Sequence, residues 1–322
     1  MTSSSLQTSQ GRGTARAPLL AALSLGHMAI HWYQQLWPVI IPSVKLSLGV
    51  SNIQLGTLSS LRHFTTGPMM LPSGILADFF RNRTATILAA AFVFLGVSHF
   101  LVAEAPSFGW IIPGIMLLGI GHALWHPAAM GSLSLRSPEK RGSAFAIHGV
   151  GASIGDTLGP IAIGSVLLVL TWQDMLKLHL VPALIVGVLL WKILGSIYKT
   201  EEGTRPSVKS FLRDAKGLFQ NRVVLVIIGV TVLTQMARLS VITFLPVFIQ
   251  DDLQYSALGL GLFWGLLHVM GTVSQPVMGY LSDKFGRKPV LLPSLVIFSL
   301  LYFALSVATP GIQLMLVIGA LG

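Results

Sequence analysis

Residues 279–288 read GYLSDKFGRK, and residues 74–83 read GILADFFRNR. Both segments begin with Gly-x-Leu-x-Asp, contain basic residues and interrupt long apolar runs. A pattern that occurs once in each half of a chain indicates an internal repeat, and repeated helical bundles are typical of transporters. The two segments therefore predict two related groups of helices, each with a short charged turn at the same place.

The composition excludes an ordinary soluble domain. Of the 322 residues, 53% are hydrophobic and only 10% are charged, whereas about 25% are charged in a typical soluble domain. Mean hydropathy is +0.75, and the 33 Gly and 17 Pro fit membrane helices, in which these residues are frequent. The chain has no Cys, so disulfides and thiolate chemistry are excluded. We expect an all-α polytopic membrane protein.

Apolar runs of about 20 residues are long enough to cross a bilayer. The sequence predicts nine complete spans and a tenth that begins near Gly311, at 19–44, 53–77, 84–103, 108–135, 143–170, 178–198, 223–249, 256–281 and 289–308. With a cytoplasmic N-terminus, most Lys and Arg fall in cytoplasmic loops, and only Lys45 and Lys177 fall in the opposite loops. Because basic loops stay in the cytoplasm, this orientation is favoured, in a bacterial inner (plasma) membrane. The net charge of +10 then reflects loops rather than nucleic acid binding.

A polar segment divides the chain into four predicted parts. Residues 1–18 form a disordered cytoplasmic N-terminus, and 19–198 form a six-helix bundle. Residues 199–222 form a cytoplasmic linker, because they are the longest polar stretch, and 223–322 form an incomplete second bundle.

The charged turns resemble the loop motif of the major facilitator superfamily. The second copy fits the motif fully, whereas the first has Arg81 in place of Gly and Phe79 in place of a basic residue. The resemblance implies the major-facilitator fold of two six-helix bundles. Since the family has twelve helices, a chain of about nine and a half spans predicts a truncated product with an incomplete second bundle.

In physical terms, the two turns predict a conformational latch on the cytoplasmic side. Gly permits close helix approach, an Asp near a helix N-terminus is stabilised by the helix dipole, and the basic residues can pair with acids across the turn. The alternative is that the acids are merely solvated. The predicted latch consists of Gly74, Asp78, Arg81, Arg83, Gly279, Asp283, Lys284, Gly286, Arg287 and Lys288.

The fifth span carries a second family mark in Gly151, Gly155, Gly159 and Pro160. Glycines at i, i+4 and i+8 form one smooth helix face for close packing. The run resembles the antiporter-associated motif of the family, and a packing stripe without directional meaning is the alternative.

Three segments resemble the fosmidomycin-resistance-like branch of the superfamily. They are GHMAIHWYQ at 26–34, GIGHALWHP at 119–127 and the glycine run of the fifth span. The sequence departs from the branch at His31, where an Asp is usual, and at Ala128, where an acid is common.

Polar residues inside the predicted spans are candidates for the solute site, because a charge at the bilayer centre costs roughly 2.5–3.5 kcal/mol. His27, His31 and Gln34 share a helix face at i, i+4 and i+7, and they line a cavity or form a packing network. The predicted substrate-binding residues are His27, His31, Gln34, Gln35, Arg62, Trp125, His126, Arg238 and His268.

Three charged residues extend this hypothesis. Arg62 and Arg238 lie in opposite halves, and paired N–H donors of Arg bind carboxylate, phosphate or phosphonate. Asp156 is the only acid well inside a span, so it is the first candidate for proton coupling, together with His31. The alternative for all three is a structural ion pair or hydrogen bond.

Zinc or copper binding by His27, His31, His122 and His126 is a weaker interpretation, because no Cys, Met or acidic cluster strengthens it. We therefore expect no metal and no cofactor.

The sequence favours a secondary active transporter that moves a small organic solute by alternating access. Proton-coupled efflux of a drug or organic anion is the first choice; proton-coupled or facilitated uptake of an anion and a non-transporting sensor or scaffold are the alternatives. An enzyme is not expected, since no Ser/His/Asp grouping, HExxH or phosphate-binding loop occurs. The predicted partners are solute, protons and lipid, without nucleic acid, and the protein is expected to be a monomer.

Overall fold

The computed structural model describes residues 4–198, 213 and 216–322, and within these ranges its regular structure is entirely helical. In chain order the elements are α1 (Ser4–Leu48), α2 (Asn52–Phe79), η1 (Arg81–Arg83), α3 (Thr84–Ala103), α4 (Phe108–Arg136), α5 (Arg141–Val166), α6 (Trp172–Leu178), α7 (Leu180–Tyr198), α9 (Arg222–Val247), η2 (Phe248–Asp252), α10 (Ala257–Phe285), α11 (Arg287–Ser306) and α12 (Ile312–Leu321).

Local sequence signals explain several helix ends. Ser51 and Gln54 form a capping box at the start of α2, in which each side chain bonds the backbone N–H of the other residue. Ser256 caps α10 through the backbone N–H of Gly259. Gly286 separates α10 from α11 with a φ of +90°, a conformation that side chains with a Cβ rarely adopt.

Each predicted span overlaps a helix, and the predicted span 84–103 matches the bounds of α3. Within the described residues, six helical segments are long and apolar enough to cross a membrane, at Arg81–Ala103, Phe108–Arg136, Trp172–Tyr198, Arg222–Asp252, Ala257–Phe285 and Arg287–Ser306. The helices α1, α2 and α5 are also long, but they do not meet this criterion, and α1 and α5 carry the polar network described below. The count of about nine and a half spans stays a prediction.

Two of the four predicted parts of the chain need comment, namely the N-terminal segment 1–18 and the linker 199–222. Helix α1 begins at Ser4, so residues 4–18, for which we expected disorder, belong to a helix; they contain no Pro before Pro18 that would break it. The predicted linker 199–222 lies mostly outside the described residues, which omit 199–212 and 214–215.

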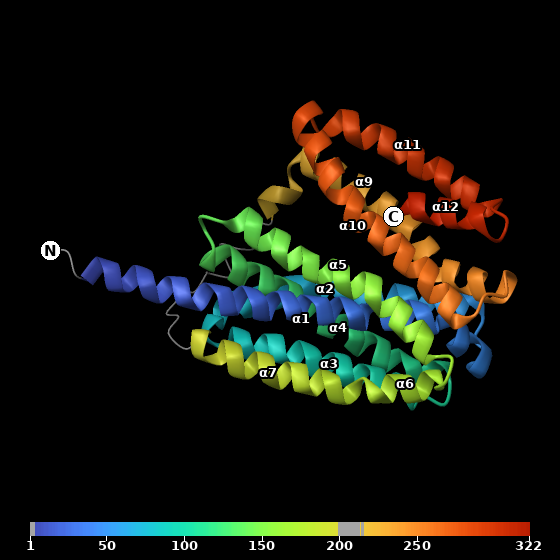
Figure 1. Cartoon of the computed structure of the whole chain (residues 1–322), viewed down its shortest axis with the longest axis horizontal. Coiled ribbons are helices and arrows are strands. Elements are labelled where there is room, and N and C mark those ends of the chain that lie inside the picture. Colours follow the sequence, from blue (N-terminus) through green and yellow to red (C-terminus); the bar gives the residue numbers. More distant parts are fainter. Residues whose placement is uncertain (1–3, 199–212, 214–215) are drawn as a thin grey trace.

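The helices form two groups, which Figure 1 shows in blue to yellow and in orange to red. In the first group, α1 packs on α5, α2 packs on α4, and α3 packs on both α4 and α7. Most of the buried apolar core lies here, with fully buried residues such as Leu23, Leu36 and Phe92. In the second group, α10 contacts α11 and α12, while most side chains of α9 and α11 are exposed.

Helix α5 joins the two groups, because its glycines allow close approach on both sides. A Cβ at Gly155 would collide with the backbone of Met28 in α1, and a Cβ at Gly164 would collide with the backbone of Ala257 in α10. Glycine is therefore required at these contacts. The resulting approach of α1 to α5 positions the polar residues of the site.

Candidate functional site

A continuous chain of hydrogen bonds crosses from α10 through α1 to α5. The indole Nε1 of Trp264 donates to Oε1 of Gln35 at 2.8 Å, and Nε2 of Gln35 donates to Oδ1 of Asp156 at 2.5 Å. The other carboxylate oxygen, Oδ2, lies 2.8 Å from Nδ1 of His31. These hydrogen bonds thus join three helices in two groups.

This series of hydrogen bonds continues to His27, where the donor and the acceptor can be assigned. Nδ1 of His27 donates to the backbone carbonyl of His148 at 2.9 Å, because a carbonyl oxygen can only accept. In a neutral His27 ring, Nε2 is then an acceptor, and it lies 3.1 Å from Nε2 of His31. The two Nε2 atoms thus face each other at hydrogen-bond distance.

Helical spacing in α1 explains why these residues share one side. His27, His31 and Gln35 follow each other at i, i+4 and i+8, so their side chains lie one above the next. Gln35, which is buried, takes the position in the network that the spacing i+7 had assigned to Gln34. No side-chain hydrogen bond of Gln34 occurs in the described part of the chain.

Two further imidazoles pack against this network. The ring of His126, from α4, lies 5.4 Å from the ring of His27 and 5.9 Å from that of His31, both in edge-on contact. The ring of His148 stacks on His27 with centroids 3.9 Å apart. His268 in α10 lies within electrostatic range of Asp156 and Arg238, so the polar region includes both groups of helices.

Arg62 carries a buried charge in α2, with only 6% of the residue exposed. Neither Asp156 nor any other acid pairs with its guanidinium within the described ranges. The Asp156 carboxylate bonds His31 and Gln35 instead. Arg238 in α9 is exposed, and both arginines lie within electrostatic range of His63.

Trp125, another predicted site residue, lies in the core of the first helix group rather than in the hydrogen-bond network. Its side chain is fully buried in the core of the first group, where its ring meets Phe92 edge-on at 5.5 Å and fills the space beside Gly26. The part of Trp125 in solute binding stays a prediction.

The two charged turns differ in their surroundings. Asp78 forms an ion pair with Arg81 at 3.6 Å within the first turn, and Gly74 lies against Pro127 of α4. In the second turn, the ammonium of Lys284 lies 5.7 Å from the ring of Tyr280. Neither pair connects the two helix groups, so the latch stays a prediction.

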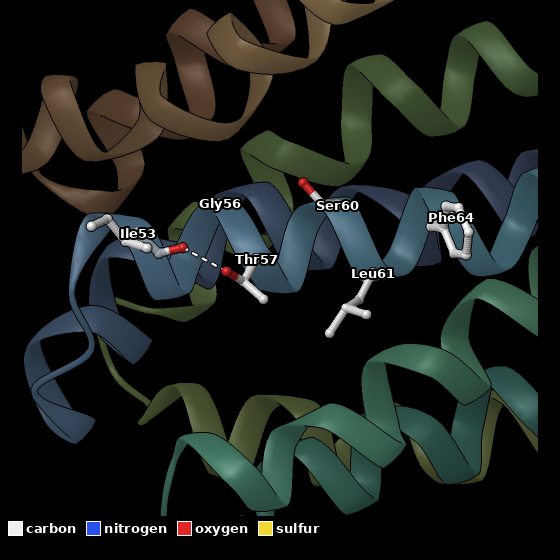
Figure 2. Close-up of a pocket in the computed structure, with 6 residues that line it drawn as sticks. All are labelled: Ile53, Gly56, Thr57, Ser60, Leu61 and Phe64. Atoms are coloured by element: carbon white, nitrogen blue, oxygen red, sulfur yellow. Dashed lines mark hydrogen bonds between the residues drawn. The ribbon is translucent and has the colours of Figure 1, made fainter.

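A groove of about 450 Å³ runs along α2. Figure 2 shows its lining residues, Ile53, Gly56, Thr57, Ser60, Leu61 and Phe64. None of the predicted site residues lines this groove, which is separate from the histidine network.

Sequence reasoning missed three residues that bond α1 to the second helix group, namely Trp264, Lys45 and Asp251. Trp264 lies one helical turn before His268, a spacing that places both on one face of α10. Lys45 and Asp251 form an ion pair of 2.6 Å between the end of α1 and η2, and a pairing over such a sequence distance has no local signal.

Comparisons with known proteins agree with this architecture. Residues 20–322 match the family model of the Major Facilitator Superfamily. The uncharacterized MFS-type transporter YfnC of Bacillus subtilis (strain 168) is 24% identical over 310 residues, which cover 94% of this chain and 75% of YfnC. The probable nitrate transporter NarT of Staphylococcus epidermidis is 25% identical over 284 residues, covering 86% of this chain and 69% of NarT.

Two further comparisons concern a fosmidomycin resistance protein and a solved structure. The fosmidomycin resistance protein of Escherichia coli (strain K12) is 25% identical over 143 residues, which cover 44% of this chain and 35% of that protein. A crystal structure of a bacterial homologue of the human lysosomal transporter Spinster, inward-facing and unoccupied, has a TM-score of 0.76 and 17% identity. The match covers 95% of this chain and 72% of that one, and it shows the fold alone.

Proposed function

The chain belongs to the major facilitator superfamily, and from this premise we propose that it transports a small organic anion by alternating access of its two helix groups. The family and the fold support a transporter. The anion is our inference from the charges in the predicted spans, and export of a drug-like or organic anion is the direction that we propose.

The observation that carries the anion is the buried guanidinium of Arg62. Burying a charge is costly unless a partner compensates it, and no acid of the described residues compensates this one. A carboxylate, phosphonate or similar group would do so through paired N–H donors. Arg238 belongs to the other helix group and shares the electrostatic neighbourhood of His63, so an anion between the groups can be held from both sides.

Contacts between the groups support alternating access. The ion pair of Lys45 with Asp251 and the bond of Trp264 to Gln35 both join α1 to the second group. Each consists of polar groups that can separate and be solvated, so they suit a contact that forms in one state and opens in another.

Two relatives favour an anionic solute and export, respectively. NarT is named a probable nitrate transporter, and the Escherichia coli relative is named for resistance to fosmidomycin. Facilitated or proton-coupled uptake and a sensor role are the alternatives. Proton coupling through Asp156 and His31, and the monomeric state, stay predictions.

The test is flux of labelled anions in proteoliposomes of the full chain. Nitrate, a short carboxylate and a phosphonate are loaded inside or added outside, each with and without an imposed pH gradient. We expect flux of at least one anion, and Arg62→Gln should lower it by about tenfold or more, since a charge-assisted hydrogen bond contributes roughly 1.5–3 kcal/mol.

Lys192→Gln is the matched control, because it removes one positive charge from the exposed face of α7. It should leave flux unchanged. Equal flux in the Arg62→Gln and Lys192→Gln proteins would remove Arg62 from the site. If no anion moves but a neutral solute does, the anion proposal is wrong.

A further inference from the structure

Three imidazoles from two helices converge at one point of the network. His27 and His31 come from α1 and His126 from α4, and one ring nitrogen from each lies within 4.8 Å of the others. Nitrogen ligands of this kind suit Zn²⁺, Co²⁺, Ni²⁺ and Cu²⁺, whereas Mg²⁺ and Ca²⁺ prefer oxygen.

The ring arrangement is close to that of a tetrahedral metal site. With metal–nitrogen bonds of about 2.0–2.1 Å, tetrahedral angles place ligand nitrogens about 3.3 Å apart and ring centroids about 5 Å apart. The Nε2 atoms of His27 and His31 are 3.1 Å apart, and the three centroid distances are 4.5, 5.4 and 5.9 Å. The rings are nearly perpendicular to each other, at 81–88°.

The opposite nitrogens of two rings are held as they are in metal sites. Imidazoles that bind a metal almost always donate their other N–H to a carbonyl or carboxylate, which fixes the ring and increases its basicity. Here Nδ1 of His27 meets the His148 carbonyl and Nδ1 of His31 meets the Asp156 carboxylate. Gln35 in turn holds Asp156.

We propose that His27, His31 and His126 bind one divalent transition-metal ion of the Zn²⁺ type through three imidazole nitrogens. The ion binds the unprotonated ring nitrogens, so a proton that occupies one of them is released to solvent when the ion binds. The ring nitrogens lie within 4.8 Å of one another, so movement of the half-buried His126 ring by up to about 1.5 Å completes the site, since bonds of about 2 Å need nitrogens about 3.3 Å apart. A fourth coordination position stays open, as in catalytic zinc sites.

A purely structural hydrogen-bond network would explain the contact between the Nε2 atoms of His27 and His31. Such a network does not require the His126 ring. No hydrogen bond of the His126 ring occurs in the described part of the chain, although the ring lies against both other histidines. The metal proposal accounts for all three positions.

The test is titration of the full chain, without an added His tag, with Co²⁺ in detergent. We expect one equivalent to bind with the visible absorption of tetrahedral Co²⁺, and Zn²⁺ but not Mg²⁺ should displace it. His126→Gln should lower the affinity by at least 100-fold. Asp156→Asn should lower it by about 10–100-fold, the usual effect of losing a partner of a ligand.

His122→Gln is the matched control, because His122 is buried one turn earlier in α4 and bonds the Leu118 carbonyl, outside the cluster. It should bind Co²⁺ as the unaltered chain does. Thermal unfolding without metal identifies variants that fail to fold, and His126→Asn then replaces His126→Gln.

The proposal is overturned if the unaltered chain gives no tetrahedral spectrum, or if the His126 variants bind Co²⁺ as tightly as the control. Binding is measured without transport and flux without metal. Failure of either proposal therefore leaves the other standing.

Discussion

At the scale of single residues, Gln35 holds the polar network together. Its amide is buried, with 4% of the residue exposed, and it connects the indole of Trp264 to the carboxylate of Asp156. Removal of this amide leaves the buried indole N–H of Trp264 without its acceptor and takes one of two hydrogen bonds from the half-buried carboxylate of Asp156, and an unpaired buried donor costs its desolvation. Gln35 thus couples the two helix groups through one side chain.

The neighbouring glutamine provides an internal comparison. We expect Gln35→Ala to destabilise the protein by roughly 1–3 kcal/mol, the cost of an unsatisfied buried partner, and thus to lower the unfolding midpoint in detergent. Gln34→Ala removes the same atoms from a half-buried position outside the network, so its midpoint should stay near that of the unaltered chain. Equal midpoints in the two variants would contradict the role of Gln35.

At the scale of helices, the glycines of α5 determine how closely α1 approaches it, and thus whether Asp156 of α5 can reach His31 and Gln35 of α1. We expect Gly155→Ala to destabilise the protein by about 1–3 kcal/mol, as overpacking does, because the added Cβ meets the backbone of Met28 and Trp32. Gly149→Ala lies on the same helix with open space around the new Cβ, and its better helix propensity should leave stability equal or slightly higher. Thermal unfolding compares the two; similar losses would indicate that the α1–α5 contact is not tight.

The sequence predicts helices better than it predicts their contacts. Apolar length sufficed to place α3 and α4 within a residue of their observed bounds, because a membrane span has a simple length requirement. The bond between His31 and Asp156 could not be predicted, since it depends on how closely α1 approaches α5. The i+7 spacing favoured Gln34, but the helix orientation selected Gln35.

At the scale of the whole molecule, the two helix groups touch where α1 ends and α10 begins. The contacts there are the Lys45–Asp251 ion pair and the close approach of Gly164 to Ala257. The ion pair is partly exposed, with 26% and 37% of the side chains accessible, and such pairs contribute only about 0.2–1 kcal/mol. A contribution of this size can bias a two-state equilibrium without locking it.

Reversal of one charge should therefore open this end of the molecule. The chain has no Cys, so spin labels at Leu46→Cys and Asp252→Cys report the distance between the groups. We expect Lys45→Glu to increase the population of longer distances by about two- to fivefold, the population equivalent of 0.2–1 kcal/mol plus repulsion. The charge swap Lys45→Asp with Asp251→Lys should restore the short distance, and 1 M salt should weaken both effects by screening.

Labels at Leu46→Cys and Ile53→Cys, both in the first group, are the control, and the distance between them should not change. If that distance changes, or if the distance between the groups does not, this ion pair does not hold the two groups together.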